Sequence, residues 1–321
     1  MKVAVQLFGH LRSYLSTQPY LSSHLLDSYD CDIFIHTWDE LEHKDPTWYK
    51  SEHLVEDNSV IFDAVKDLYK PKGISIEKNS MIKEEGFFNK DITLRGLKAM
   101  LYSQYRVSQL REEYQKSKSI QYDLVITLRP DVLLLAELDL SRYVQEMSYS
   151  NKASIHFSNG MHAHTEGSKK IITPLAIDLF FIAKPDTTSL ICSSFLGFEK
   201  YYIDFSSTYP NGINASEASY LEAMQSNGIM PKFYAFPYVV KRLTGNNHLV
   251  AGLEVMEEFD RKLDLPDFID CNKNDQSKLI AIMLNRLSNE KLDKVKKQLA
   301  RSKRNMDKLM ALCDSIKLKR S

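Results

Sequence analysis

With 321 residues, 43% of them hydrophobic and 26% charged, the chain is long enough for one large α/β domain with an appendage, or for two smaller domains. Lys and Arg balance Asp and Glu at 42 each, so the net charge indicates no nucleic-acid partner, and the absence of a run of about 18 apolar residues predicts no membrane span. Four widely separated cysteines without a Cys-x-x-Cys pair exclude a zinc ribbon and favour a reducing, cytoplasmic environment.

The first half of the chain alternates predicted strands and helices. Short apolar runs at Val3–Phe8, Cys31–Trp38 and Gly73–Asn79 indicate strands, and apolar residues at helical spacing indicate a long helix over Thr93–Lys116. The segment "YDLVITLRPDVLLLAEL", Tyr122–Leu138, adds a fourth strand. Because these runs are continuously apolar, they predict an α/β fold with a Rossmann-type, mostly parallel sheet flanked by helices.

The pattern changes after about residue 140. The segments "KASIHF" and "AIDLFFIAKPD" predict two further strands, and "TTSLICSSFLGFEKYY" and "NASEASYLEAMQSNGI" predict two helices. Between the strands, "SNGMHAHTEGSKKIITP" is polar and predicts a long loop of the kind that forms active-site lids. His162 and His164 in this loop are open to three interpretations: metal ligands, substrate contacts or solvated side chains.

Three of the predicted strands end in polar residues. Pro130 cannot donate to a strand ladder, so the fourth strand should end at Leu128 or Arg129. The carboxyl ends of parallel strands share one edge, where open α/β sheets bind their ligands. Arg12 lies near the N-terminus of the following helix, which favours phosphate. We therefore expect a nucleotide-binding site formed by Gly9, His10, Arg12, Thr37, Trp38, Arg95, Arg129 and Asp131.

Two members of this set have an alternative structural interpretation. Trp38 is suited either to stacking on a nucleobase or to capping the core at the rim of the sheet. Arg95, Tyr102 and Gln104 lie on a helix with one polar face, which is suited to meeting the nucleotide, although its Leu and aromatic residues favour the core.

The segments "VAVQLFGHLRSY", "DIFIHTWDE" and "YDLVITLRPDVLL", in this order, resemble the sugar transferases of bacterial capsule and lipooligosaccharide loci. The resemblance covers roughly residues 1–229 and implies a glycosyltransferase fold of the GT-A type. It also implies a nucleotide-sugar as donor, and a surface glycan or lipid-linked glycan as acceptor.

The chain departs from that family at its metal-binding motif. Where the GT-A type has Asp-x-Asp, this sequence has Arg129-Pro130-Asp131. Asp131 alone could hold Mg²⁺ or Mn²⁺ together with waters and phosphate oxygens. Alternatively, Arg129 supplies the positive charge through bidentate hydrogen bonds to phosphate, or the pair only closes the strand end. The transferase interpretation as a whole requires that Asp131 be accessible and lie on the same side of the fold as Gly9.

Two carboxylates are candidates for the base that deprotonates an acceptor hydroxyl. Glu217 lies in the first turn of a predicted helix, where the resemblance places an acidic residue on the acceptor side, and where an acid also favours the helix dipole. Asp178 interrupts an apolar run, where a carboxylate is costly unless it is paired or faces a cleft.

The C-terminal region is predicted to be a basic amphipathic helix. Between residues 291 and 321, apolar side chains recur every three or four positions, interrupted at Ser302, and Lys and Arg occupy the other faces. Such a helix is suited to docking on its own domain, to forming a homodimer, or to peripheral contact with an anionic membrane. We therefore expect a transferase domain over 1–263, with a nucleotide-binding half (1–140) and an acceptor half (141–263), followed by a helical extension over 264–321.

Two other functions are compatible with these features. The altered Arg-Pro-Asp motif allows a non-catalytic subunit that binds a nucleotide-sugar or a glycan within a biosynthetic complex. A nucleotidyltransferase is a further option, which is weakened by the absence of G-x-G-x-x-G and G-x-x-x-x-G-K loops.

Overall fold

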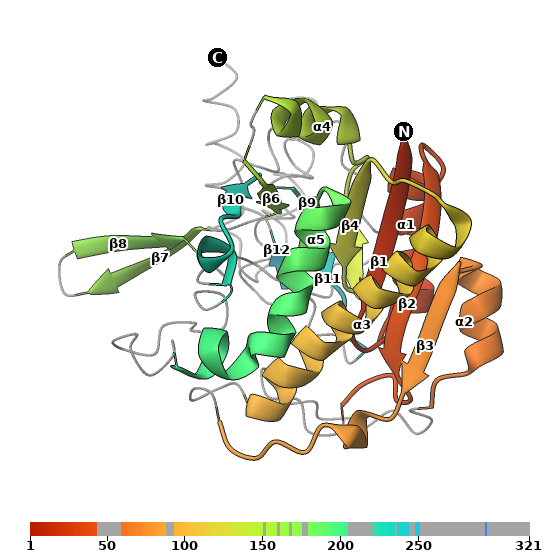
Figure 1. Cartoon of the computed structure of the whole chain (residues 1–321), viewed down its shortest axis with the longest axis horizontal. Helices are drawn as coiled ribbons and strands as arrows, with labels where there is room; N and C mark the ends of the chain where they lie inside the picture. Colours follow the sequence, from red (N-terminus) through yellow and green to blue (C-terminus); the bar gives the residue numbers. More distant parts are fainter. Residues whose placement is uncertain are drawn as a thin grey trace.

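The computed structural model of the chain describes residues 1–43, 59–87, 93–149, 152–158, 161–166, 169–174, 179–204, 220, 223–234, 236–243, 248–250 and 293. Its centre is a seven-stranded sheet with the strand order β10-β6-β9-β4-β1-β2-β3 (Figure 1). Strands β1 (Lys2–Phe8), β2 (Asp30–Trp38), β3 (Gly73–Glu77) and β4 (Leu124–Leu128) run parallel. The predicted mostly parallel α/β sheet is therefore confirmed.

The other side of the sheet contains its antiparallel strand. Strand β9 (Phe180–Ala183) lies between β4 and β6 (Ser154–Phe157) and runs antiparallel to both. Strand β10 (Met230–Phe233) pairs parallel with β6 at the edge. The six strand segments predicted from the sequence, β6 among them, are thus found in one sheet together with β10, and the apolar runs of β1, β2, β4 and β9 form its buried centre.

Helices cover both faces of the sheet, which explains the continuously apolar strands. Helices α3 (Leu94–Lys118) and α5 (Pro185–Cys192) lie across one face (Figure 1). On this face Ala4 and Phe8 pack with Val107 of α3. The alternate residues of β1, Val3, Val5 and Leu7, face a larger cluster; its helical members come from α1 (Tyr14–Leu21), the following π-helical turn (Ser22–Leu26), α2 (Phe62–Tyr69) and α4 (Leu140–Ser148).

The long helix α3 reaches the edge at which the parallel strands end. It begins at Leu94 because the hydroxyl of Thr93 accepts a hydrogen bond from the amide of Gly96 at 3.0 Å. It ends at Lys118 and is followed by Ser119, whose backbone is left-handed with φ +53°. Its 25 residues bring Tyr102 and Ser103 beneath the ends of β1, β2 and β3.

The segment after Pro130 leaves the main sheet, as the proline predicted. Strand β5 (Val132–Leu134) pairs antiparallel with β11 (Tyr238–Val240), which in turn pairs with β12 (His248–Val250). In this small sheet Val132 lies opposite Val240. The loop between β4 and β5 is therefore held between two sheets, and this placement buries Asp131.

The structure corrects the predicted loop between β6 and β9. Its backbone forms an antiparallel hairpin of β7 (Met161–Glu166) and β8 (Lys169–Pro174), which projects to the left in Figure 1. The prediction was wrong because it took polar composition as a sign of irregular structure, whereas the hydrogen bonds of a strand ladder are made by backbone groups that every non-proline residue carries. The side chains of His162 and His164 lie outside the description.

Other predicted helices are found only in part. The segment from Thr187 to Tyr202 is divided among α5, a 3₁₀ turn (Ser193–Gly197) and a π-helical turn (Glu199–Asp204). Another 3₁₀ turn (Asn79–Met81) follows β3. In "NASEASYLEAMQSNGI", Tyr220 and residues 223–226 are helical and the residues before them are not described. Apart from Asp293, the predicted extension lies outside the described residues. Within the described ranges, no helix combines the length and the apolar character needed to cross a bilayer.

Candidate functional site

The loop after β1 is bent back beneath the edge of the sheet. Gly9 has φ +87°, and its amide donates a hydrogen bond to the hydroxyl of Ser103 on α3 at 2.7 Å. Arg12 has φ +46°, and its amide donates to the carbonyl of Leu41, which follows β2, at 2.9 Å. A positive φ is uncommon for a residue with a side chain, and such strained positions concentrate at functional sites. The strain here directs the Arg12 side chain toward the end of β4.

Three guanidinium groups meet at the carboxylate of Asp131. Arg12 Nη1 donates to Oδ2 at 2.9 Å, and Arg242 Nη1 donates to the same oxygen at 3.3 Å. Arg129 is bidentate: its Nε donates to Oδ1 at 2.8 Å, and its Nη2 donates to Oδ2. Arg12 Nε also donates to Glu42 Oε1 at 2.6 Å. We refer to these residues, Arg12, Glu42, Arg129, Asp131 and Arg242, as the arginine cluster.

Burial differs sharply within the arginine cluster. The Asp131 side chain is 0% exposed, whereas each of its three arginine partners is 14% exposed. Burial raises the pKa of Asp131, and the charges of Arg12 and Arg242 act in the opposite direction. The Asp131 carboxylate therefore lies beneath the guanidinium groups, and three arginines reach the surface beside one carboxylate, that of Glu42, which is 10% exposed.

Two members of the arginine cluster were missed by sequence analysis. Arg242 is placed by the small sheet, because Val240 pairs with Val132 and the amide of Lys241 donates to the Asp131 carbonyl at 2.8 Å. Glu42 lies in the polar segment that follows β2. For Arg242 the sequence offers only a weak signal, the apolar run "YVV" followed by two basic residues.

A second polar group, the Glu77 cluster, lies beside the arginine cluster at the ends of β2 and β3. The Glu77 carboxylate accepts from Tyr102 Oη at 2.7 Å and from Arg106 Nε at 3.0 Å, and His36 Nε2 lies 3.6 Å away. These contacts lower the pKa of Glu77, and burial lowers the pKa of His36. On its other side His36 Nδ1 lies 2.7 Å from Ser103 Oγ, the group that binds the Gly9 amide. The Glu77 cluster therefore supports the Gly9 turn from below.

Several residues predicted to bind a nucleotide instead lie in the protein interior around the Glu77 cluster. Trp38 is 1% exposed and stacks on Tyr102, with ring centroids 5.8 Å apart. Of its two interpretations, the position of Trp38 therefore matches capping of the core and not stacking on a nucleobase. Thr37 is fully buried. Arg95 Nη2 donates to the carbonyl of Asn79 at 3.2 Å.

His10 lies between the two clusters. Its ring centroid is 6.4 Å from that of Trp38, and its Nδ1 is 3.1 Å from the carbonyl oxygen of Glu40. Because a carbonyl only accepts, Nδ1 carries the proton. Burial and the neighbouring charge of Arg12 lower the pKa of His10 to about 3, so its imidazole is neutral at pH 7.

The residues predicted to act on the acceptor are not described by the structure. Glu217 and Asp178 both lie outside the described residues, so their role as a base stays a prediction. Of the eight residues expected at the nucleotide, Arg12 and Arg129 both contact Asp131, and Gly9 and His10 lie three and two positions before Arg12 in the same turn.

The residues around Asp131 do not fit a divalent metal ion. A carboxylate oxygen has about two lone pairs, and Oδ2 already accepts from three guanidinium groups. A cation at this carboxylate would also lie among three like charges, which repel it. Elsewhere among the described residues, no group of three or more His, Cys, Asp or Glu side chains is arranged to hold a metal.

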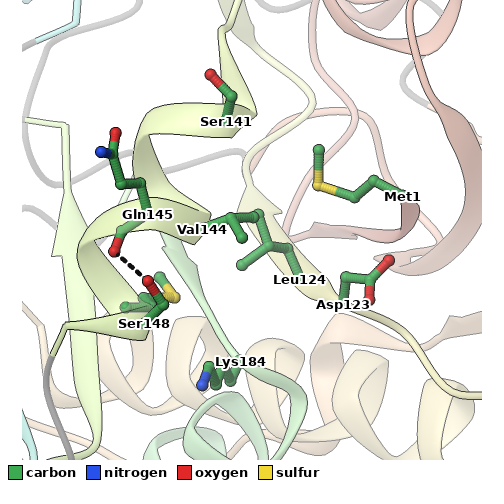
Figure 2. A pocket seen from close by; sticks show the side chains of 9 residues that line it. Met1, Asp123, Leu124, Ser141, Val144, Gln145, Ser148 and Lys184 are labelled. Atoms are coloured by element: carbon green, nitrogen blue, oxygen red, sulfur yellow. Dashed lines mark hydrogen bonds between the residues drawn. The ribbon is translucent and has the colours of Figure 1, made fainter.

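A cavity of about 560 Å³ lies at the opposite edge of the sheet (Figure 2). It is lined by Met1 and Leu124, which lie at the starts of β1 and β4, and by Val144 and Gln145 of α4. Asp131 follows the other end of β4. The cavity therefore does not belong to the site formed by the arginine cluster.

The fold and the arginine cluster define the chain as an α/β protein with a cationic site at the carboxyl edge of a mostly parallel sheet. Comparisons with protein-family models and with curated proteins find no match. Among solved structures, the chain is similar to the glycosyltransferase GlyE from Streptococcus pneumoniae TIGR4, with 13% identity and a TM-score of 0.31. The match covers 71% of this chain and 44% of GlyE, so the chain spans less than half of that protein.

Two other solved structures are similar to the chain at a comparable level. Core-mannan synthase A from Aspergillus fumigatus, solved with Mn and GDP, has 10% identity and a TM-score of 0.40, over 74% of this chain and 73% of that one. The 2-C-methyl-D-erythritol 4-phosphate cytidylyltransferase of Francisella tularensis has 10% identity and a TM-score of 0.35, over 82% and 99%. At these values the likenesses assign no function to the chain.

Proposed function

We propose that the protein is a glycosyltransferase that moves a sugar from a nucleotide-sugar donor to a glycan acceptor. The observation that carries this proposal is the contact of Arg12 with Asp131 at 2.9 Å, between residues 119 positions apart. It joins the loops after β1 and β4 at the carboxyl edge, where open α/β sheets bind ligands. The sequence set two conditions for a transferase: Asp131 must lie on the same side of the fold as Gly9, and it must be accessible. The contact with Arg12, in the turn that begins at Gly9, meets the first condition. The second is not met, because the Asp131 side chain is 0% exposed. Its accessible neighbours are arginines, which suit a diphosphate.

The reaction that we propose is a displacement at the anomeric carbon of the donor sugar. The hydroxyl oxygen of the acceptor forms a bond to this carbon while the bond to the diphosphate oxygen breaks, and its electron pair leaves with the nucleoside diphosphate. The hydroxyl proton passes to a base, for which we propose Glu217 or Asp178. The arginine cluster stabilises the negative charge that develops on the departing diphosphate.

The finer assignments are proposals that rest on the sequence. We propose a GT-A-type transferase domain over residues 1–263 that acts in the cytoplasm on a bacterial capsule or lipooligosaccharide acceptor, free or lipid-linked. The basic extension over 264–321 is suited to holding the enzyme at the inner face of a membrane or to forming a homodimer.

The inaccessible carboxylate favours one alternative, a non-catalytic subunit that binds a nucleotide-sugar or a glycan. A protein that had lost one carboxylate of the family motif and buried the other would keep a cationic site and lose turnover. The two functions share the donor site and differ in the acceptor base, so they are separated by turnover rather than by binding.

Thermal-shift measurements with UDP, GDP, CMP and their sugars, with and without Mn²⁺, test the donor site. A ligand at about 100 times its Kd stabilises the folded state by about 2.7 kcal/mol, which raises the melting temperature. No shift with any member of the panel would refute the proposal. For a donor that binds, release of its sugar to a glycan acceptor supports the transferase, and binding without release supports the alternative. Glu217→Gln and Asp178→Asn, which retain the donor site, then identify the base by loss of kcat.

A further inference from the structure

The arginine cluster is formed by segments that are distant in the sequence. Arg12 comes from the turn after β1, Arg129 from the end of β4, and Arg242 from the end of β11. All three donate to the same oxygen of Asp131, and each remains 14% exposed. Two sheets and a strained backbone at Arg12 are needed for this convergence. A fold that needed only to close the end of β4 would be served by the Arg129–Asp131 pair alone.

The accessible face of the cluster has the chemistry of an anion site. Among its five residues, three arginines outnumber two carboxylates, and the carboxylate shared by the arginines is the group farthest from solvent. A guanidinium has five N–H donors in a plane, which suits bidentate binding of phosphate oxygens. Arg129 uses two of its donors on Asp131 and has others in the same plane. A group with several anionic oxygens in a row, such as a diphosphate, can contact more than one of these arginines at once.

In this arrangement, Asp131 acts on the arginines rather than on a ligand. Fully buried, it holds three like charges within hydrogen-bonding distance of one point, where they would otherwise repel one another. Two hydrogen bonds to backbone carbonyls fix its loop: the amide of Lys241 donates to the Asp131 carbonyl, and the hydroxyl of Thr17 donates to the Pro130 carbonyl. Asp131 is therefore a positioning residue.

We infer that Arg12, Arg129 and Arg242, positioned by Asp131, bind the diphosphate of the donor without a divalent metal ion. This inference rests on the proposed function for the identity of the ligand, but the site itself is defined for any diphosphate. In it, the guanidinium groups supply the positive charge that a metal ion supplies in a carboxylate-based site.

Calorimetric titration with inorganic pyrophosphate, in EDTA and in MnCl₂, tests the inference on the full chain. The wild type should bind pyrophosphate in EDTA, with an affinity that MnCl₂ does not raise. Loss of hydrogen bonds from a charged donor predicts that Arg242→Gln weakens binding by about tenfold or more, and that Arg242→Lys retains part of it. Arg129→Gln is a second variant at the same site. Arg142→Gln, which removes an exposed arginine of α4 at the opposite edge of the sheet, is the matched control and should bind like the wild type.

The Mn²⁺ response also separates positioning from ligation at Asp131. A positioning role predicts that neither the wild type nor Asp131→Asn gains affinity from Mn²⁺. A gain in the wild type that disappears in Asp131→Asn would identify a metal ligand and overturn the inference.

The inference and the proposed function can fail separately. Binding of pyrophosphate and nucleotides only with Mn²⁺ overturns the inference and leaves the transferase intact. Binding of pyrophosphate in EDTA without binding of any nucleotide-sugar supports the metal-free site and refutes the donor. Absence of pyrophosphate binding in both buffers, or equal affinity in Arg242→Gln and the wild type, overturns the inference whatever the nucleotides do.

Discussion

The two carboxylate clusters at the edge of the sheet are built from similar groups in different proportions. Glu77 has one arginine, Arg106, and its other contacts are to a tyrosine, a serine and a neutral histidine. Asp131 has three arginines and is more deeply buried, with 0% of its side chain exposed against 20% for Glu77. Both clusters satisfy a carboxylate, but only the second gathers several cations around it.

This difference in composition suits the two clusters to different roles: the Glu77 cluster to structural support and the arginine cluster to binding. A carboxylate with one cation and several neutral donors is satisfied within the protein, and here it holds the turn at Gly9 in place through His36 and Ser103. Three cations that share one carboxylate repel one another and are retained only where the surroundings enforce the arrangement. A cluster of this second kind is suited to binding an anion, which is the role proposed above for the arginine cluster.

The largest expected effect is the loss of stability in Asp131→Ala. Removing one partner of a buried ion cluster typically costs about 3–5 kcal/mol, because the remaining charges are left without compensation. Urea denaturation should show a lower midpoint with an unchanged m-value. Because the cost arises from repulsion among the arginines, pyrophosphate should restore part of the lost stability.

The matched control for this variant is Asp123→Ala. Asp123 is exposed and accepts one hydrogen bond, from the amide of Lys2 at 2.7 Å, so its loss should cost less than about 1 kcal/mol. If Asp131→Ala were no more destabilised than this control, the arginines would not depend on Asp131, and the contrast between the two clusters would disappear.

The sequence predicted part of the arginine cluster, but it did not predict all of its members or the role of Trp38. Apolar runs and Pro130 predicted where β1 and β4 end, and parallel strands bring such ends together, so the meeting of Arg12 with Asp131 followed from local patterns. Arg242 could not be found in this way, because its position depends on the pairing of β11 with β5, which no local pattern encodes. Trp38 has the same local signal whether it faces a nucleobase or the core, and only the packing of Tyr102 against it decides.

A smaller effect is expected for Glu77→Gln. Hydrogen bonds to a charged group contribute about 1.5–3 kcal/mol, so the variant should lose about 2 kcal/mol at pH 7. Unlike the arginine variants, it should bind pyrophosphate within about twofold of the wild type, because the Glu77 cluster supports the site without touching the anion. A tenfold loss of affinity at unchanged fold would place Glu77 in the binding site and contradict the division between the clusters.

The difference between Glu77→Gln and the wild type should depend on pH. Contacts with His36, Tyr102 and Arg106 hold the pKa of Glu77 below its ordinary value of 4.5 in the folded state. The ionised carboxylate therefore contributes its full stability above about pH 4.5, and this contribution is lost as the pH falls below that value. Urea titrations from pH 7 to pH 3 should show the stability curves of the two proteins converging on the acidic side.

The smallest expected effect distinguishes the Gly9 turn from an ordinary turn. A Cβ at Gly9 would meet no atom within 4 Å, so Gly9→Ala is opposed only by its φ of +87°, at a cost of about 1 kcal/mol. Gly228→Ala is the matched control: it has φ +67° and equally open space, and it precedes β10 at the opposite edge of the sheet. Both variants should lose similar stability in urea. Only Gly9→Ala should also weaken pyrophosphate binding, because its turn leads into Arg12. Equal affinities in the two variants would show that the Gly9 turn does not influence anion binding.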